Sequence, residues 1–130
     1  LDQARPAAAF HAEALGGALE AGHAALAAEE RAVLRRLAAI PSAFTMETAM
    51  RVGGGAALDV APDVVPSVVE RLAARMLVVG EPGRGGSPRF RLLRPVRWHA
   101  RVKLAEAGEA GAVAALWLAS AAADGTSGAA

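Results

Sequence analysis

Apolar side chains recur with a helical period in the first half of this chain, and prolines and glycines separate the segments that carry them. In the segment 28–40, Val33, Leu34 and Leu37 share one face, while Arg36 lies on the opposite side. A proline follows directly and cannot continue the helix. The pattern therefore predicts an amphipathic helix with one buried face.

Two further helices are predicted after a short connection. Thr45 is a good N-cap for a helix over 46–52, which a run of three glycines ends. The next helix begins near Val64, with Asp63 as its N-cap, and its apolar stripe continues to Met76. Helices joined by such a short turn are typical of a helix-turn-helix arrangement.

The period then changes from that of a helix to that of a strand. The segment 76–81 is apolar and β-branched, and 88–93 alternates charged with bulky side chains, so the two predict a hairpin with a Gly-rich tip. A helix over 95–107 follows at once, with Pro95 in its first turn and Gly108 after its end. A winged-helix domain ends with this order of elements. The predicted fold is therefore mainly α with a small β-hairpin: a helix-turn-helix plus wing, with extra flanking helices.

The rest of the chain forms two flanks. Residues 1–27 are predicted as flanking helices that Gly16 and Gly17 interrupt, and residues 110–130 as a C-terminal helix and a flexible tail. The winged-helix domain then occupies 28–109, and we expect the chain to be a piece of a longer polypeptide.

Composition narrows the function. The chain has 130 residues, no cysteine and a formal net charge of +1, so a disulfide framework, a thiol nucleophile and a polyelectrolyte role for the whole molecule are excluded. No apolar run approaches the roughly 18 residues of a membrane span, and the expected location is the cytoplasm. The histidines lack metal-ligand spacing, and no glycine run is followed by the Lys-Ser/Thr of a phosphate loop. We therefore expect no catalytic residue, no metal and no enzyme activity.

Basic residues are concentrated in the wing and the helix after it. Half of the 14 basic residues fall within this stretch, with no acidic residue among them: Arg84, Arg89, Arg91, Arg94, Arg97, Arg101 and Lys103. Such a run could contact the phosphates of DNA, or it could be a solvated face or a protein interface. The third helix, which would read bases in a DNA-binding winged helix, has acidic residues in and before its first half and basic ones only in its last turn. Direct base readout is therefore disfavoured.

Three segments of the chain together resemble a known domain. They are 28–49, then Arg71-Leu-Ala-Ala-Arg-Met-Leu-Val-Val, then the stretch 90–109 that opens with Phe90-Arg-Leu-Leu-Arg-Pro-Val-Arg-Trp-His. In order and spacing they are similar to the winged-helix segment of bacterial STAND-type ATPase regulators of the LuxR-like and antibiotic-regulatory group. Those proteins join an NB-ARC-like nucleotide-binding module to this winged helix and then to helical repeats.

The resemblance implies a non-catalytic switch element. In that family the domain packs on the nucleotide-binding module, and ATP or ADP belongs to the parent protein rather than to this fragment. The implied partners are that module and the repeats, with no membrane, and DNA is less favoured for this domain. The alternative function is a DNA-binding transcription factor that contacts phosphates through the basic wing and the last helix.

The chain also departs from its relatives around the end of the wing. Relatives in plants and animals have a nucleotide-sensing Met-His-Asp motif where this chain has Leu92, Leu93 and Arg94. His99 stands where the family tends to have an aromatic on the inner face, and Trp98 takes a position that is usually polar. A solvent-facing Trp marks a contact surface, so we expect Trp98, with the arginines beside it at 94, 97 and 101, to face a neighbouring domain.

Overall fold

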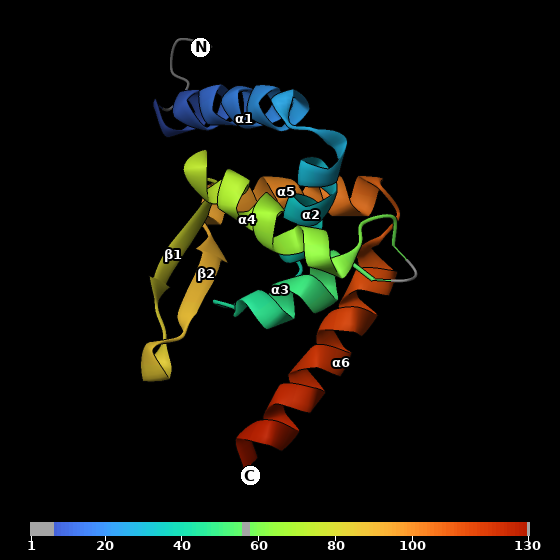
Figure 1. Ribbon diagram of the computed structural model, residues 1–130. Helices are drawn as coiled ribbons and strands as arrows, with labels where there is room; N and C mark the ends of the chain where they lie inside the picture. The colour runs from blue at the N-terminus through green and yellow to red at the C-terminus, as the bar shows by residue number, and fades with distance from the viewer. Residues whose placement is uncertain (1–6, 56–57, 130) are drawn as a thin grey trace.

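The computed structural model describes residues 7–55 and 58–129, with side chains at 15–55, 58–83 and 85–123. Helices dominate, and one antiparallel pair of strands projects from them (Figure 1). The elements in chain order are α1 (Ala7–Ala25), α2 (Ala28–Leu37), α3 (Met46–Gly53), η2 (Pro62–Val64), α4 (Val65–Ala74), β1 (Val78–Pro82), η3 (Arg84–Gly86), β2 (Pro88–Leu92), α5 (Arg94–Glu106) and α6 (Ala110–Ala129). The predicted mainly helical fold with a small hairpin is confirmed.

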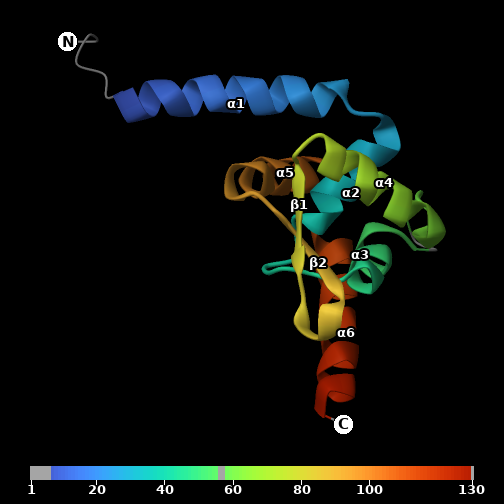
Figure 2. The same ribbon diagram turned by 60° about the vertical axis from the view of Figure 1, so that its left-hand side comes forward.

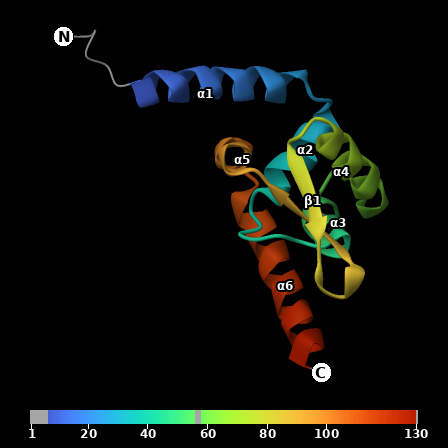
Figure 3. The ribbon, with the colours of Figure 1, turned by 90° about the vertical axis from the view of Figure 1, so that its left-hand side faces the viewer.

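Helix α2 is the centre of the core because three other helices pack around it. Val33 and Leu37 are fully buried, and they meet the stripe of α4, in which Val68 and Leu72 are fully buried too. Helices α3, α4 and α5 all contact α2, with α4 on one side of it and α5 on the other (Figure 3). The helical periodicity of the sequence therefore identifies the core correctly.

The ends of α3 and α4 differ in how well the sequence predicts them. Thr45 caps α3 as predicted, because the backbone N–H of Thr48 donates to its Oγ1 at 3.3 Å. Asp63 is not the N-cap of the next helix, since it lies in the 3₁₀ turn η2 and α4 begins at Val65. Met76 is not in the core either: its φ of 63° takes the chain out of the helix, and the side chain is exposed. The predicted helix is thus too long at its C-terminal end.

The wing is the hairpin of β1 and β2, in which Val78 pairs with Leu92 and Pro82 with Pro88. β1 therefore starts two residues later and ends one residue later than predicted, and β2 ends one residue earlier. Phe44 adds a third short element, because it forms a bridge with Phe90 on the free edge of β2. Its backbone N–H donates to the Phe90 carbonyl at 2.8 Å, and the reverse bond has the same length. The sequence did not predict this bridge.

Helix α1 is one continuous helix that lies across one end of the body (Figure 2). Gly16 and Gly17 lie inside it, so the predicted interruption is wrong. At the other end of the chain α6 packs against α3 and then extends away from the body (Figure 1). It includes residues 124–129, which the sequence assigns to a flexible tail.

Arg36 is the largest fully buried side chain among the described residues, although its place opposite the apolar face predicts exposure. Its Nη1 donates to the Gly53 carbonyl at 3.1 Å, and its Nη2 lies 2.7 Å from Asp59 Oδ1 and 2.8 Å from Glu109 Oε2. The guanidinium therefore ties α2 to the end of α3, to the loop before α4 and to the residue before α6. Arg35 Nε also donates to Glu109 Oε1, at 2.9 Å.

Candidate functional site

The N-terminal half of α5 carries most of the side chains that the sequence singles out. The helix starts directly after β2, with Leu93 at the N-cap position and Pro95 in the first turn. Val96, Ala100 and Leu104 face the core and are buried. This fixes the rotation of the helix, and it leaves the other faces available for contacts.

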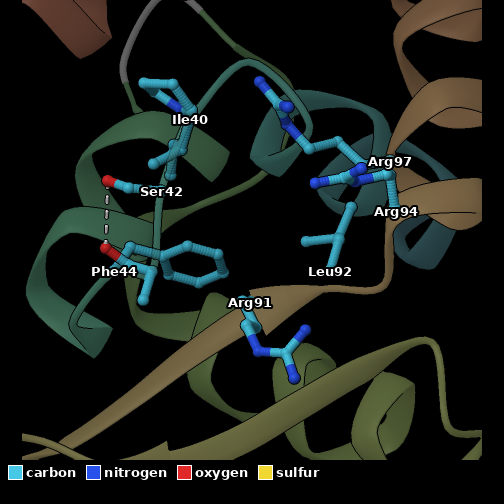
Figure 4. A pocket seen from close by; sticks show the side chains of 9 residues that line it. Ile40, Ser42, Phe44, Arg91, Leu92, Arg94 and Arg97 are labelled. Atoms are coloured by element: carbon cyan, nitrogen blue, oxygen red, sulfur yellow. Dashed lines mark hydrogen bonds between the residues drawn. The ribbon is translucent and has the colours of Figure 1, made fainter.

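On one side of α5 a hollow of about 200 Å³ lies between the connection from α2 to α3, the end of β2 and the first turns of α5. We call it the arginine hollow, because Arg91, Arg94 and Arg97 line it (Figure 4). Phe44 lies across from the two α5 arginines. These three basic side chains therefore come together from a strand and a helix.

The three arginines differ in how their charges are balanced. Arg91 Nε lies 3.4 Å from Glu81 Oε2 on the neighbouring strand. Arg94 and Arg97 have no ion pair within the part of the chain that the structure describes. The Nε of Arg97 is shielded from solvent and has no hydrogen-bond partner among those residues. A buried donor without an acceptor is uncommon in native proteins, so this N–H is available to a water or a ligand.

On the other side of α5 lies an apolar groove of about 640 Å³, which we call the tryptophan groove. Leu15 and Leu19 of α1 form one wall, and Trp98 and Val102 of α5 form the other. Trp98 is 76% exposed, as the sequence predicts for an outward position. Arg94 lines both the groove and the arginine hollow, so the two form one continuous surface around the start of α5.

A polar clamp holds α1 to α5 at the far end of this groove. Glu20 accepts from Lys103 Nζ at 2.7 Å and lies 2.8 Å from His99 Nε2, and these contacts lower the pKa of Glu20 to about 2. Lys103 also lies 3.4 Å from Glu106. Lys103 was predicted as a contact for a partner or for DNA, but its ammonium is engaged within the chain.

His23 completes the clamp from α1. Its ring meets that of His99 edge-on, with 5.5 Å between the centroids, and its Nε2 is buried without a partner among the described residues. Burial lowers the pKa of His23; the positive charges of Lys103 and Arg31 act in the same direction, and Glu20 opposes them. Neutral His23 is therefore the form that the packing of α1 favours.

The comparisons with known proteins agree with this architecture. A family model described as a winged helix-turn-helix domain matches residues 26–105, which run from before α2 almost to the end of α5. The chain belongs to the winged helix-turn-helix family. No curated protein and no solved structure matches it. This finding confirms the predicted winged helix; the resemblance to STAND-type regulators remains a prediction.

In a winged helix-turn-helix domain α4 is the helix that would enter the major groove of DNA. Here Arg71 lies 2.7 Å from Glu29 and 3.5 Å from Glu30, so its charge is engaged within the fold. Glu70 is exposed on the same helix, and the basic side chain of Arg75, at the end of that helix, is exposed as well. This face of the domain thus offers few free donors to base edges.

The other predicted contact residues divide between the wing and α5. Arg89 is exposed on β2. Arg101 is exposed on α5 and lines neither the arginine hollow nor the tryptophan groove. The side chain of Arg84, at the tip of the wing, lies outside the described residues. Since α4 and α5 flank opposite sides of α2, the α5 arginines do not extend the surface of α4 (Figure 3).

The described residues contain neither a metal site nor a membrane span. No group of three or more histidine and acidic side chains is placed to hold a metal ion there. None of the described helices is both long and apolar enough to cross a bilayer. Winged helix-turn-helix domains are typically DNA-binding regulatory modules without catalysis.

Proposed function

We propose that this winged helix-turn-helix domain is a non-catalytic regulatory element that packs, through the N-terminal half of α5, on the nucleotide-binding module of a multidomain bacterial regulator. The observation that supports it best is Trp98, a large apolar side chain that is 76% exposed between an apolar groove and two arginines, Arg94 and Arg97, that have no ion pair with any described residue. The resemblance to STAND-type regulators supplies the proposed partner. ATP or ADP would bind the parent protein, in the cytoplasm, and not this domain.

The energetics favour docking at Trp98. An indole offers up to about 250 Å² of surface, so covering the exposed part of Trp98 would gain roughly 4 kcal/mol before the costs of association. Aromatic residues beside arginines are the usual anchors of protein interfaces. Arg94 lines both the arginine hollow and the tryptophan groove, so it would meet acidic or polar groups at the edge of the interface around Trp98.

The test is Trp98→Ala in the full-length regulator, with Leu118→Ala as its control. Leu118 is also a large exposed apolar residue, but it lies on α6, away from this surface. We expect Trp98→Ala to weaken the packing of the domain on its neighbour by at least about tenfold and to change nucleotide-dependent activation. If Trp98→Ala altered neither property, or altered them no more than the control, this role would be wrong.

A second candidate function is DNA binding through the wing, which the exposed Arg89 and Arg75 favour. Contacts to phosphates would make binding to random duplex DNA strong at low salt and weak at high salt. We expect this chain to show little binding even near about 50 mM salt, because Arg71 of α4 is paired with Glu29 and Glu30 and the α5 arginines lie on the other side of α2. Tight, salt-dependent binding that Arg89→Gln weakens would favour DNA as the partner.

A further inference from the structure

We propose that the arginine hollow is a binding site for a phosphate dianion, the terminal phosphate group of a small molecule. The site consists of Arg91 at the end of β2 and of Arg94 and Arg97 in the first turns of α5, opposite Phe44 (Figure 4). It does not depend on the docking role, because the hollow and the unpaired charges belong to this chain alone.

Charge balance in the hollow favours a doubly charged ligand. Glu81 offsets the charge of Arg91, whereas Arg94 and Arg97 have no acidic partner among the described residues. The first turn of α5 contains no acidic residue, and the N-terminus of a helix adds about half a positive charge. Roughly two positive charges are thus left without a counterion. A phosphate monoester carries about −1.5 to −2 at neutral pH and matches them, while a carboxylate balances only one.

Two kinds of hydrogen-bond donor are present in residues that line or adjoin the hollow. The Nε of Arg97 is shielded from water and has no partner among the described residues. Leu93, at the N-cap position, cannot accept a bond through its side chain, so the backbone N–H groups of Arg94 and Val96 lack a side-chain cap. Phosphate oxygens commonly bind to donors of both kinds, because an arginine fork and a helix N-terminus each present N–H groups in a fixed geometry.

The size of the hollow distinguishes a terminal phosphate from the backbone of DNA. At about 200 Å³, bounded by a loop, a strand and a helix, it can enclose one compact anion. A phosphodiester carries only one charge per phosphate and continues on both sides into sugars, so it fits an open basic face better. The floor beside Ile40, Phe44 and Leu92 is apolar and strengthens the electrostatic attraction of the bound anion.

The experiment is an NMR titration of the 130-residue chain with inorganic phosphate at constant low ionic strength. We expect saturable shifts of the Arg97 Nε–H resonance and of the Arg94 and Val96 amides. Sodium acetate at equal ionic strength should shift them much less. Arg97→Gln should weaken phosphate binding by about tenfold or more, the effect of losing one charge-assisted contact.

The matched control is Arg101→Gln, which removes the same charge from the same helix but lies outside the hollow; it should change the affinity by about twofold or less. If Arg97→Gln failed to fold, as judged by its thermal melt, Arg97→Lys would replace it, since it keeps the charge but removes the Nε donor. The proposal would be overturned by an unmoved Nε–H resonance, by acetate binding as well as phosphate, or by equal losses in the variants at 97 and 101. Binding of duplex DNA that competes with phosphate would instead assign the hollow to a nucleic-acid backbone and overturn the terminal-phosphate assignment.

Discussion

The buried guanidinium of Arg36 gives the sharpest stability prediction. Arg36→Met removes a side chain that is 0% exposed and whose donors reach Gly53, Asp59 and Glu109. Asp59 is 80% exposed and returns to water at little cost, but the side chain of Glu109 is only 22% exposed and the Gly53 carbonyl loses its buried donor. We expect the free energy of unfolding to fall by about 3 kcal/mol.

The matched control is Arg91→Met, because Arg91 also pairs with an acidic side chain but is 47% exposed, and its partner Glu81 is 39% exposed. Its loss should cost about 0.2–1 kcal/mol. Both values come from urea unfolding, where a shifted midpoint at an unchanged m-value reports stability alone. Equal costs for the two variants would refute the reasoning that burial makes the Arg36 contacts important.

The contacts of Arg36 with Asp59 and Glu109 also make the stability of the fold depend on pH. Arg36 lowers the pKa of Glu109 and of Asp59 in the folded protein, from ordinary values of 4.5 and 3.8. The unfolded chain therefore binds more protons than the folded one in this range, so the stabilisation is fully present above the ordinary values and is lost as the pH falls below them. The loss should be smaller in Arg36→Met. An equal acid-induced loss in both proteins would contradict this account.

Three further predictions concern single positions. Gly54→Ala should destabilise the fold by about 1–3 kcal/mol, because a Cβ there would lie 2.9 Å from backbone atoms of Val60 and Pro62. Its control is Gly111→Ala in α6, where a Cβ would meet open space, and this variant should be neutral or stabilising in the same urea assay. His23→Phe should reduce the loss of stability that we expect as the pH falls below about 6.5, because burial lowers the pKa of His23 in the folded protein and its protonation therefore favours the unfolded state; an equal loss in the variant would belong to another group. Trp98→Ala should leave the stability of the chain by itself within about 0.5 kcal/mol of wild type; a larger loss would mean that the indole supports the fold.

The sequence predicts the winged-helix core well because periodic apolar stripes in α2, α3 and α4 have only one way to bury together. It fails where local propensity is a weak guide. Gly16 and Gly17 do not end α1, since each glycine costs a helix only about 1 kcal/mol and no competing turn residue follows. Arg36 lies opposite the apolar face of α2, yet the fold buries it because Glu109 lies 73 residues away in sequence and cannot be paired with it in advance.

The candidate site is predicted in part. The basic residues of the wing and α5, and the exposure of Trp98, follow from composition and period alone. Their grouping does not, because the wall of the arginine hollow opposite them is the irregular connection at Phe44, far away in sequence. The engagement of Lys103 depends on Glu20, which is 83 residues away, so only the position of α1 in the fold reveals it.

The position of α5 distinguishes two possible roles of the basic residues, contact with DNA and contact with a neighbouring domain or ligand. The sequence alone does not distinguish them, because these residues form one run. Arg89 lies on the wing and Arg75 at the end of α4, and any duplex that entered along α4 would approach that side of α2. Arg94, Arg97 and Trp98 belong to the helix on the other side (Figure 3). A substitution in either group therefore reports on one surface, and a loss of DNA binding in Arg97→Gln would indicate that the duplex contacts the arginine hollow rather than α4.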